Sequence, residues 1–244
     1  MPTAVERKAL SDALQHLNEN MRTMAELSVL AIRKAVQALG KDADHNADEV
    51  FAIDQEIYGL KQQVELACIQ LIALYAPVAS DLRTITSSLE ITTDLDRIGR
   101  YSKDIAEAAE KLRGMWRGSL GKLGNLSRMA DMTIRMIETS VNAFVQRQVE
   151  PVRDIVRTDD AIDALHDEVF QELVEKMSDQ SVAPRVGAQL ILINRYFERL
   201  ADHAVNIGQD VIYMITAERP PRVKRLSEES PSAGPAAKAS ASSS

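Results

Sequence analysis

Residues 53–74 read IDQEIYGLKQQVELACIQLIAL, and the apolar residues in this stretch recur at alternating intervals of four and three. This spacing places them on one stripe of a helix and is typical of the seam of an antiparallel bundle or coiled coil. The stretch therefore predicts a long helix that packs against other helices. Its seam residues are Ile53, Ile57, Leu60, Val64, Ala67, Leu71 and Leu74.

A second copy of this pattern lies further along the chain. Residues 25–39 align with residues 130–144, a shift of 105 positions, and Asp54 falls on Asp159 at the same shift. Towards the end of each copy the shift is 102 positions, as a short deletion near 177–183 would produce. Similar stretches in the same order, with one small deletion, indicate an internal duplication.

The composition favours helices throughout the duplicated part. Aromatic residues make up only 4% of the chain, there are 10 glycines in 244 residues, and good helix formers are abundant. No segment has the pattern of a strand. We expect an all-α protein, a tandem repeat of two antiparallel three-helix bundles with six long helices. The expected helices span residues 5–40, 47–75, 78–113, 123–148, 151–177 and 183–218.

The helix breaks suggest how the chain is divided. We expect a first three-helix repeat at 1–113, a Gly-rich hinge at 114–124, a second repeat at 125–218 and a disordered tail at 219–244. Trp116 in the hinge either anchors a contact between repeats or subunits, or packs within its own chain. The tail either aids solubility or is weakly attracted to an anionic membrane surface through basic residues Arg219, Arg222, Lys224 and Arg225.

Charge and hydropathy exclude several classes of protein. The net charge of −7 argues against nucleic acid as a main partner. No run approaches the ~20 apolar residues of a membrane span, and the N-terminal residues do not resemble a signal peptide. The single cysteine, Cys68, lies beside the seam and is interpreted as a small buried residue rather than a nucleophile. We expect a cytoplasmic protein.

Two short motifs occupy equivalent places in the two repeats. Residues 198–202 read ERLAD and residues 96–100 read DRIGR, so each has an acid, then arginine, then a second polar residue one helical turn after the acid. The second repeat has a complete pair of carboxylates, whereas the first has a cation, Arg100, in place of the second acid. This contrast is the most informative functional feature of the sequence.

Carboxylates four residues apart lie on one face of a helix and repel each other unless positive charge lies between them. Divalent or iron-group metal ions (Mg²⁺, Mn²⁺, Fe, Zn²⁺) bind such pairs in helical bundles. The pattern also fits a solvated helix face on which Arg195 and Arg199 pair with the acids. His203 points about 100° away from Asp202, which precedes it in the sequence, and is therefore a weaker ligand candidate. The candidate metal ligands here are Glu198, Asp202 and Asn206, which continue a ladder that starts at Asn194.

The matching ladder in the first repeat is Thr92, Asp96, Arg100 and Asp104. Arg100 lies one turn from each acid, so its guanidinium group can bridge both. A second acid pair, Glu90 and Asp94, lies beside this ladder and has no acidic counterpart in the other repeat. The candidate metal ligands of this repeat are Glu90, Asp94 and Asp96.

Residues 94–99 (DLDRIG) and 197–207 (FERLADHAVNI) resemble the two signature helices of the PhoU family of phosphate-uptake regulators. The resemblance covers residues 5–218 and includes the tandem three-helix repeat. The family pattern is acid-Arg-Ile-Gly-Asp in both halves. Glu198 and Asp202 match its two acids, whereas Arg100 departs from it.

The resemblance implies a cytoplasmic, often homodimeric, all-α protein without enzymatic activity, peripheral to the membrane at most through its partners. It implies two partners, the ATPase of the high-affinity phosphate ABC transporter and a two-component sensor histidine kinase, which such proteins hold in its off state when phosphate is abundant. Some members bind multinuclear metal clusters through acid-x-x-x-acid motifs. On this ground we expect one metal-competent repeat, with Glu198 and Asp202, and one salt-bridged repeat, with Arg100.

Two other classes of protein fit part of the sequence. A carboxylate-bridged metal enzyme or metal store needs Glu-x-x-His pairs on facing helices, and none of the four histidines has a glutamate three residues before it. A helical scaffold or metal-binding protein without a role in phosphate signalling accounts for the heptads but not for the paired acid–arginine motifs. With these two classes set aside, the resemblance implies a negative regulator of phosphate uptake and of phosphate-starvation signalling.

Overall fold

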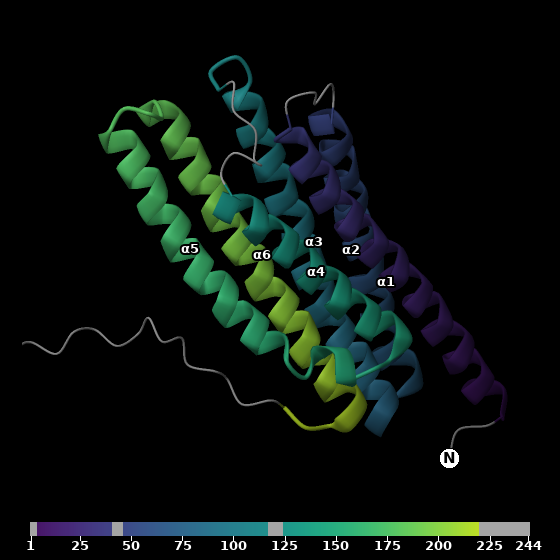
Figure 1. Ribbon diagram of the computed structural model, residues 1–244. Coiled ribbons are helices and arrows are strands. Elements are labelled where there is room, and N and C mark those ends of the chain that lie inside the picture. The colour runs from purple at the N-terminus through teal and green to yellow at the C-terminus, as the bar shows by residue number, and fades with distance from the viewer. Residues whose placement is uncertain (1–3, 41–45, 117–123, 220–244) are drawn as a thin grey trace, which may run out of the picture.

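A computed structural model describes residues 4–40, 46–116 and 124–219. All of its regular structure in these residues is helical, as predicted, and the long helices run side by side (Figure 1). Each long helix begins and ends within four residues of its expected bounds. The helices are α1 (Ala4–Ala38), α2 (Asn46–Tyr75), α3 (Ala79–Leu112), α4 (Gly124–Gln146), α5 (Ile155–Ser178) and α6 (Pro184–Thr216), with a short 3₁₀ helix, η2 (Glu150–Val152), before α5.

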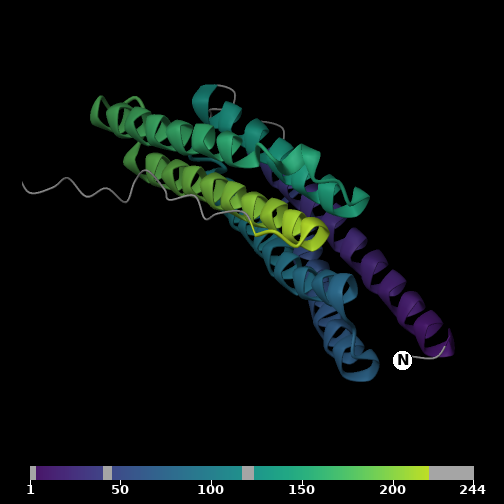
Figure 2. The same cartoon turned by 90° about the horizontal axis from the view of Figure 1, so that it is seen from below.

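The helices form two trios. Helices α1, α2 and α3 pack against one another, as do α4, α5 and α6. The trios meet where α3 lies along α6 and where α1 crosses α4. In Figure 2, α2 and α5 lie at opposite edges of the molecule. The third helix of each trio, which carries the acid–arginine motif, is therefore at the centre of the protein.

Helix α2 shows how far the heptad pattern holds. Ile57, Val64 and Leu71, seven residues apart, are all buried. The other seam series consists of Ile53, Leu60, Ala67 and Leu74, and its burial declines along the helix. Leu74 is 72% exposed, so the expectation that it packs in the seam is wrong. A straight α-helix drifts by about 20° per heptad, and over three heptads this drift carries the end of that series out of the interface.

Hydroxyl groups join the first and third helices in the same way in both trios. Ser28 Oγ on α1 donates to the backbone carbonyl of Leu95 on α3 at 3.2 Å. Thr133 Oγ1 on α4 donates to the carbonyl of Phe197 on α6 at 3.5 Å. The repeat shift of 105 positions relates the two donors and the shift of 102 relates the two acceptors, so the duplication predicted from the sequence is present in side-chain detail.

Equivalent residues of the two repeats also meet each other where the trios join. Arg33 of α1 forms an ion pair with Glu138 of α4, and the two occupy the same position in their repeats. The rings of Tyr101 on α3 and His203 on α6 stack with centroids 5.7 Å apart, and these too are equivalent. Equivalent residues touch only close to a symmetry axis. An approximate two-fold axis therefore relates the two halves of the chain.

The loops and ends differ in places from expectation. Helix α5 begins at Ile155 rather than at 151, because Pro151 lies in η2 and one further turn separates η2 from the helix. Trp116 packs against the core of its own chain. Most of the predicted hinge (117–123) and nearly all of the predicted tail (220–244) lie outside the described residues.

Two further expectations concern the membrane and Cys68. Among the described residues, no helix is both long and apolar enough to cross a membrane. Cys68 is fully buried in the core, and burial raises the pKa of its thiol to about 12. A thiol that is both inaccessible and protonated is a poor nucleophile. The interpretation of Cys68 as a small core residue is therefore confirmed.

Candidate functional site

The acidic pair of the second repeat is held by arginines from its own helix. Glu198 is buried, and its Oε1 lies 2.8 Å from Nη1 of Arg195. Arg199 lies between the two acids, with 3.7 Å from its Nε to Glu198 Oε2 and 3.6 Å from its Nη1 to Asp202 Oδ2. The two guanidinium groups therefore supply the positive charge that two carboxylates one turn apart require.

The outer members of the predicted ladder turn away from this pair. Asn194 Nδ2 donates to the carbonyl of His166 on α5 at 2.9 Å. Asn206 Nδ2 donates to Asp94 Oδ1 on α3 at 3.2 Å. Each step of four residues rotates the side chain by about 40° around the helix, so three steps carry it to another face. Asn206 thus lies in the contact between the repeats rather than beside Glu198 and Asp202.

In the first repeat the acid of the motif pairs mainly with a lysine from another helix. Asp96 is buried, and Lys61 Nζ of α2 lies 3.0 Å from its Oδ2. Arg100, which was expected to bridge two acids, lies 3.9 Å from Asp96. Among the described residues, Asp104 has no cation within ion-pair distance, so Arg100 does not form the expected bridge. The heptad pattern alone gave no reason to assign Lys61 to the site.

Two more carboxylates lie close to the first-repeat motif, Asp54 on α2 and Asp104 on α3. Burial raises the pKa of both groups, and the charges of Lys103 and Arg100 oppose that shift. Asp54 Oδ1 is buried and has no hydrogen-bond partner among the described residues. The alignment of Asp54 with Asp159 was the one signal in the sequence that could have marked this residue as part of the site.

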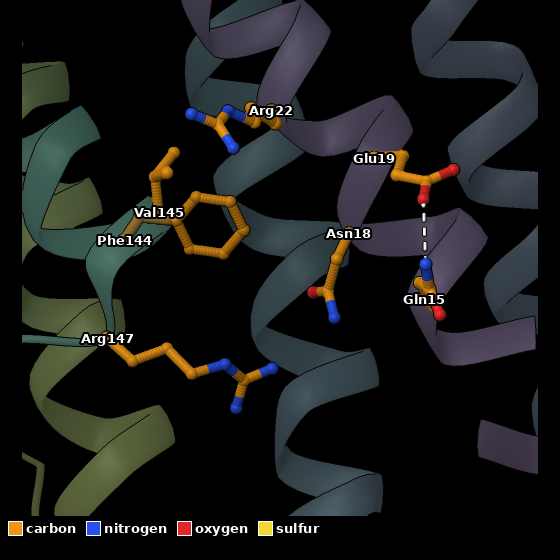
Figure 3. A pocket seen from close by; sticks show the side chains of 7 residues that line it. All are labelled: Gln15, Asn18, Glu19, Arg22, Phe144, Val145 and Arg147. Atoms are coloured by element: carbon orange, nitrogen blue, oxygen red, sulfur yellow. Dashed lines mark hydrogen bonds between the residues drawn. The ribbon is translucent and has the colours of Figure 1, made fainter. Parts of the chain in front are cut away.

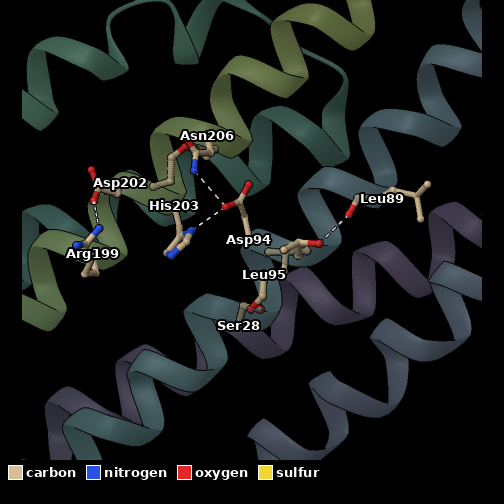
Figure 4. A network of polar contacts seen from close by, with 11 residues as sticks. Ser28, Leu89, Asp94, Leu95, Arg199, Asp202, His203 and Asn206 are labelled. Atoms are coloured by element: carbon tan, nitrogen blue, oxygen red, sulfur yellow. Dashed lines mark hydrogen bonds and ion pairs between the residues drawn. The ribbon is translucent and has the colours of Figure 1, made fainter. Parts of the chain in front are cut away.

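A third polar cluster lies between the repeats, where α3 meets α6 (Figure 4). Asp94 Oδ1 is 2.7 Å from Nδ1 of His203 and also accepts the hydrogen bond from Asn206. One turn beyond Asn206, burial and the charges of Asp94 and Glu90 together raise the pKa of Asp210 to about 7. This cluster consists mainly of acids, and one histidine joins it across the interface.

The predicted first-repeat ligands do not share a common position. Asp94 points to α6, whereas Asp96, two residues later, points to Lys61 on α2. Positions two apart on a helix face nearly opposite directions. Glu90 is exposed on the surface. The structure therefore separates Asp96 from Asp94, and it leaves Glu90 on the surface.

The donor types of the second repeat suit a hard cation, but the geometry does not favour one as it stands. Arg195 and Arg199 already neutralise the carboxylates of Glu198 and Asp202. Within residues 4–40, 46–116 and 124–219, no group of three or more His, Cys, Asp or Glu side chains is placed to hold a metal ion. A metal ion at this pair would have to displace the arginines.

Two three-helix repeats related by an approximate two-fold axis, each with an acid–arginine motif on its third helix, define a class of duplicated helical-bundle proteins. Comparison of the sequence with models of known protein families identifies the family to which this chain belongs. The PhoU domain matches residues 21–109 and 126–211, one match in each repeat, and the chain belongs to the PhoU family.

Relatives extend over nearly the whole chain. A phosphate-specific transport system accessory protein PhoU homolog from Clostridium acetobutylicum is 29% identical over 214 residues, covering 87% of this chain and 97% of that protein. The homolog 1 of the same name from Methanothermobacter thermautotrophicus is 30% identical over 219 residues, covering 90% and 98%. Both repeats and their motifs therefore lie within the shared region.

Solved structures agree with this assignment. The crystal structure of PhoU from Pseudomonas aeruginosa has a TM-score of 0.79 and 27% identity, covering 85% of this chain and 99% of that one. The phosphate transport system regulatory protein PhoU from Streptococcus pneumoniae has a TM-score of 0.78 and 26% identity, covering 87% and 99%. The six-helix architecture is thus shared at full length.

Proposed function

We propose that this chain is a regulatory protein of the phosphate-specific transport system. The observation that carries the proposal is that relatives with the name of accessory protein of this system match the chain over both repeats and almost their full length. In both motifs the leading acid forms ion pairs with cations of the same chain, and this arrangement supports a role in binding partners rather than in catalysis.

In finer terms, we propose an adaptor that contacts the ATPase of the phosphate transporter and a two-component sensor kinase. The chain would hold the kinase in its off state when phosphate is abundant, and it would act in the cytoplasm as a homodimer. The approximate two-fold axis supports this reading, because it gives the molecule two similar faces with different chemistry. One carries Glu198 and Asp202 with two arginines, and the other carries Asp96 with Lys61.

Metal binding at the second repeat belongs to the same proposal. Glu198 and Asp202 are carboxylates one turn apart, and Mg²⁺, Mn²⁺, Fe or Zn²⁺ would bind there through oxygen ligands once Arg199 moved away. The metal would neutralise the pair in place of the guanidinium group. It would thereby change the charge and shape of this face of α6.

The test is deletion of the gene in its native cell, followed by measurement of secreted phosphatase activity in phosphate-rich medium. If the chain holds the kinase off, phosphatase activity is high despite abundant phosphate, and the wild-type gene restores repression. Low activity in the deletion strain, with a normal rise on phosphate starvation, would contradict the adaptor role and favour a helical scaffold or metal-binding protein.

Complementation of the deletion strain with variant genes distinguishes the loss of a partner contact from the loss of the fold. Glu198→Gln with Asp202→Asn alters one face, and Lys61→Met with Asp96→Asn alters the other. Exposed Asp131→Asn serves as a control. We expect the control to restore repression and at least one double variant to fail while circular dichroism shows a native helix content. Full repression by both double variants would exclude these faces as partner contacts.

A further inference from the structure

A cavity of about 210 Å³ lies between the first half of α1 and the C-terminal end of α4. Its walls come from both repeats, and it is separate from the three polar clusters (Figure 3). Arg22 enters it from α1 and Arg147 from the residue that follows α4. Two cations therefore line one small cavity in a protein whose net charge is −7.

The backbone at Arg147 has an unusual conformation for a residue with a side chain. Its φ of 53° lies in the left-handed region, where glycine is favoured. The N–H of Gln148 donates to the carbonyl of Ala143 at 2.9 Å, and the N–H of Arg147 donates to that of Phe144 at 3.2 Å. These two bonds form a Schellman motif, and its left-handed position is usually glycine. Here that position holds an arginine whose side chain reaches into the cavity.

Neither guanidinium group is fully used by the protein. Among the described residues, no carboxylate lies within ion-pair distance of Arg147. Arg22 gives its Nε to Glu26 at 3.1 Å, which leaves its terminal nitrogens directed at the cavity. An arginine fork fits two oxygens of a phosphate or carboxylate group. The cavity therefore presents donors suited to an anion.

The rest of the lining complements these donors. Asn18 adds an amide from α1, and Phe144 with Val145 adds an apolar wall. The single acid in the lining, Glu19, accepts a hydrogen bond from Gln15 at 3.1 Å. In Figure 3 its carboxylate is turned toward Gln15, and the ring of Phe144 lies between the two guanidinium groups. The lining thus combines two cations, amide donors and an apolar surface.

We propose that this cavity binds a small anion that carries a phosphate group. Two arginines and an amide favour a dianion with several acceptor oxygens over a singly charged carboxylate. The phosphate group belongs either to inorganic phosphate or to an ester whose body lies on Phe144 and Val145. The proposal does not depend on which proteins this chain contacts. It adds a small-molecule ligand to a protein proposed to act through protein partners.

The test is isothermal titration calorimetry of the full-length protein at fixed, low ionic strength. The three probes are inorganic phosphate, AMP and adenosine. We expect inorganic phosphate or AMP to bind and adenosine not to bind. Equal affinities for the two phosphate-bearing probes assign the site to inorganic phosphate, and tighter binding of AMP assigns it to an ester. The proposal is overturned if neither phosphate-bearing probe binds at millimolar concentration or if adenosine binds as tightly as AMP.

Arg147→Gly is the decisive variant because glycine suits the left-handed backbone. It should bind the preferred probe at least tenfold more weakly while its midpoint of thermal unfolding stays equal or rises. Arg22→Gln should weaken binding as well. Arg135→Gln, an exposed position on α4 outside the cavity, removes the same charge and should leave the affinity unchanged. An equal loss of affinity in the Arg135 control and in Arg147→Gly would show that the anion is attracted by the overall charge of the protein and not bound at a specific site.

Discussion

His203 Nδ1 lies 2.7 Å from Asp94 Oδ1, and the repeat shift of 102 positions converts this pair into Tyr101 and Tyr196, whose rings lie 5.8 Å apart. The same contact therefore occurs twice across the approximate two-fold axis. One copy is a charge-assisted hydrogen bond and the other is an aromatic contact. Together they fasten α3 to α6 on both sides of the axis.

Replacement of His203 with alanine should destabilise the protein by about 1–3 kcal/mol, because the largely buried Asp94 loses a donor and Tyr101 loses its stacked ring. Urea unfolding followed by circular dichroism measures this change. His16→Ala, at a highly exposed position, is the control and should have no effect. In a double-mutant cycle with Asp94→Ala, additive losses would show that the two side chains do not interact.

The raised pKa of Asp210 predicts a specific dependence of stability on pH. Burial, reinforced by Asp94 and Glu90, raises its folded-state pKa from 3.8 to about 7. The folded protein then binds a proton that the unfolded chain has already lost, so stability falls as pH rises from about 4 to about 7. Asp210→Asn should reduce this fall and be more stable than wild type at pH 8, as measured by urea unfolding.

The comparison for Asp210 needs two safeguards. Asp54 and Asp104 also have raised pKa values, so the variant should retain part of the pH dependence. Exposed Asp131→Asn on α4 changes the net charge equally and should follow the wild-type curve. If Asp210→Asn and wild type lose stability in parallel between pH 4 and pH 8, Asp210 does not carry the effect.

Lys61→Met should destabilise the first repeat by about 2 kcal/mol, because it removes a hydrogen bond to a charged group and leaves the buried carboxylate of Asp96 with only Arg100 at 3.9 Å. Adding Asp96→Asn removes the buried charge and should restore most of the loss. Thermal and urea unfolding of the single and double variants measure both effects. A double variant that is less stable than Lys61→Met would show that Asp96 has another, more important partner.

Arg199→Ala should increase metal binding at the second repeat, because this guanidinium group contacts both Glu198 and Asp202. We expect tighter binding of Mn²⁺ or Zn²⁺ in isothermal titration than with wild type, and loss of that binding when Asp202→Asn is added. Arg157→Ala, an exposed arginine on α5, controls for net charge. Equal metal binding by Arg199→Ala and Arg157→Ala would remove the case for a site at this pair.

The helices and their pairing could be predicted because one physical pattern repeats along the chain. The buried residues Ile57, Val64 and Leu71 follow the heptads, and the repeat shift correctly pairs Ser28 with Thr133. The prediction that Leu74 is buried in the seam failed because a heptad count ignores the drift of a straight helix.

The site was harder to predict because its contacts cross between helices. The carboxylate pair of the second repeat and its arginines are close in sequence, and the sequence anticipated both the motif and the competing ion pairs. Lys61 with Asp96 and His203 with Asp94 join different helices, and no spacing rule connects them. The cavity at Arg147 depends on a backbone conformation that local propensity assigns to glycine rather than arginine.

The approximate two-fold axis within one chain has a consequence for how the protein can change. In a symmetric dimer of single repeats every substitution would appear twice, and both faces would stay identical. In a fused pair a substitution appears once, so Arg100 occupies one half while Asp202 keeps its carboxylate in the other. The hydroxyl-to-backbone bonds from Ser28 and Thr133 join the first and third helices within each half, and they end on a backbone carbonyl, so they do not depend on which side chain the third helix carries there. A single gene can thus carry two unlike versions of the same surface.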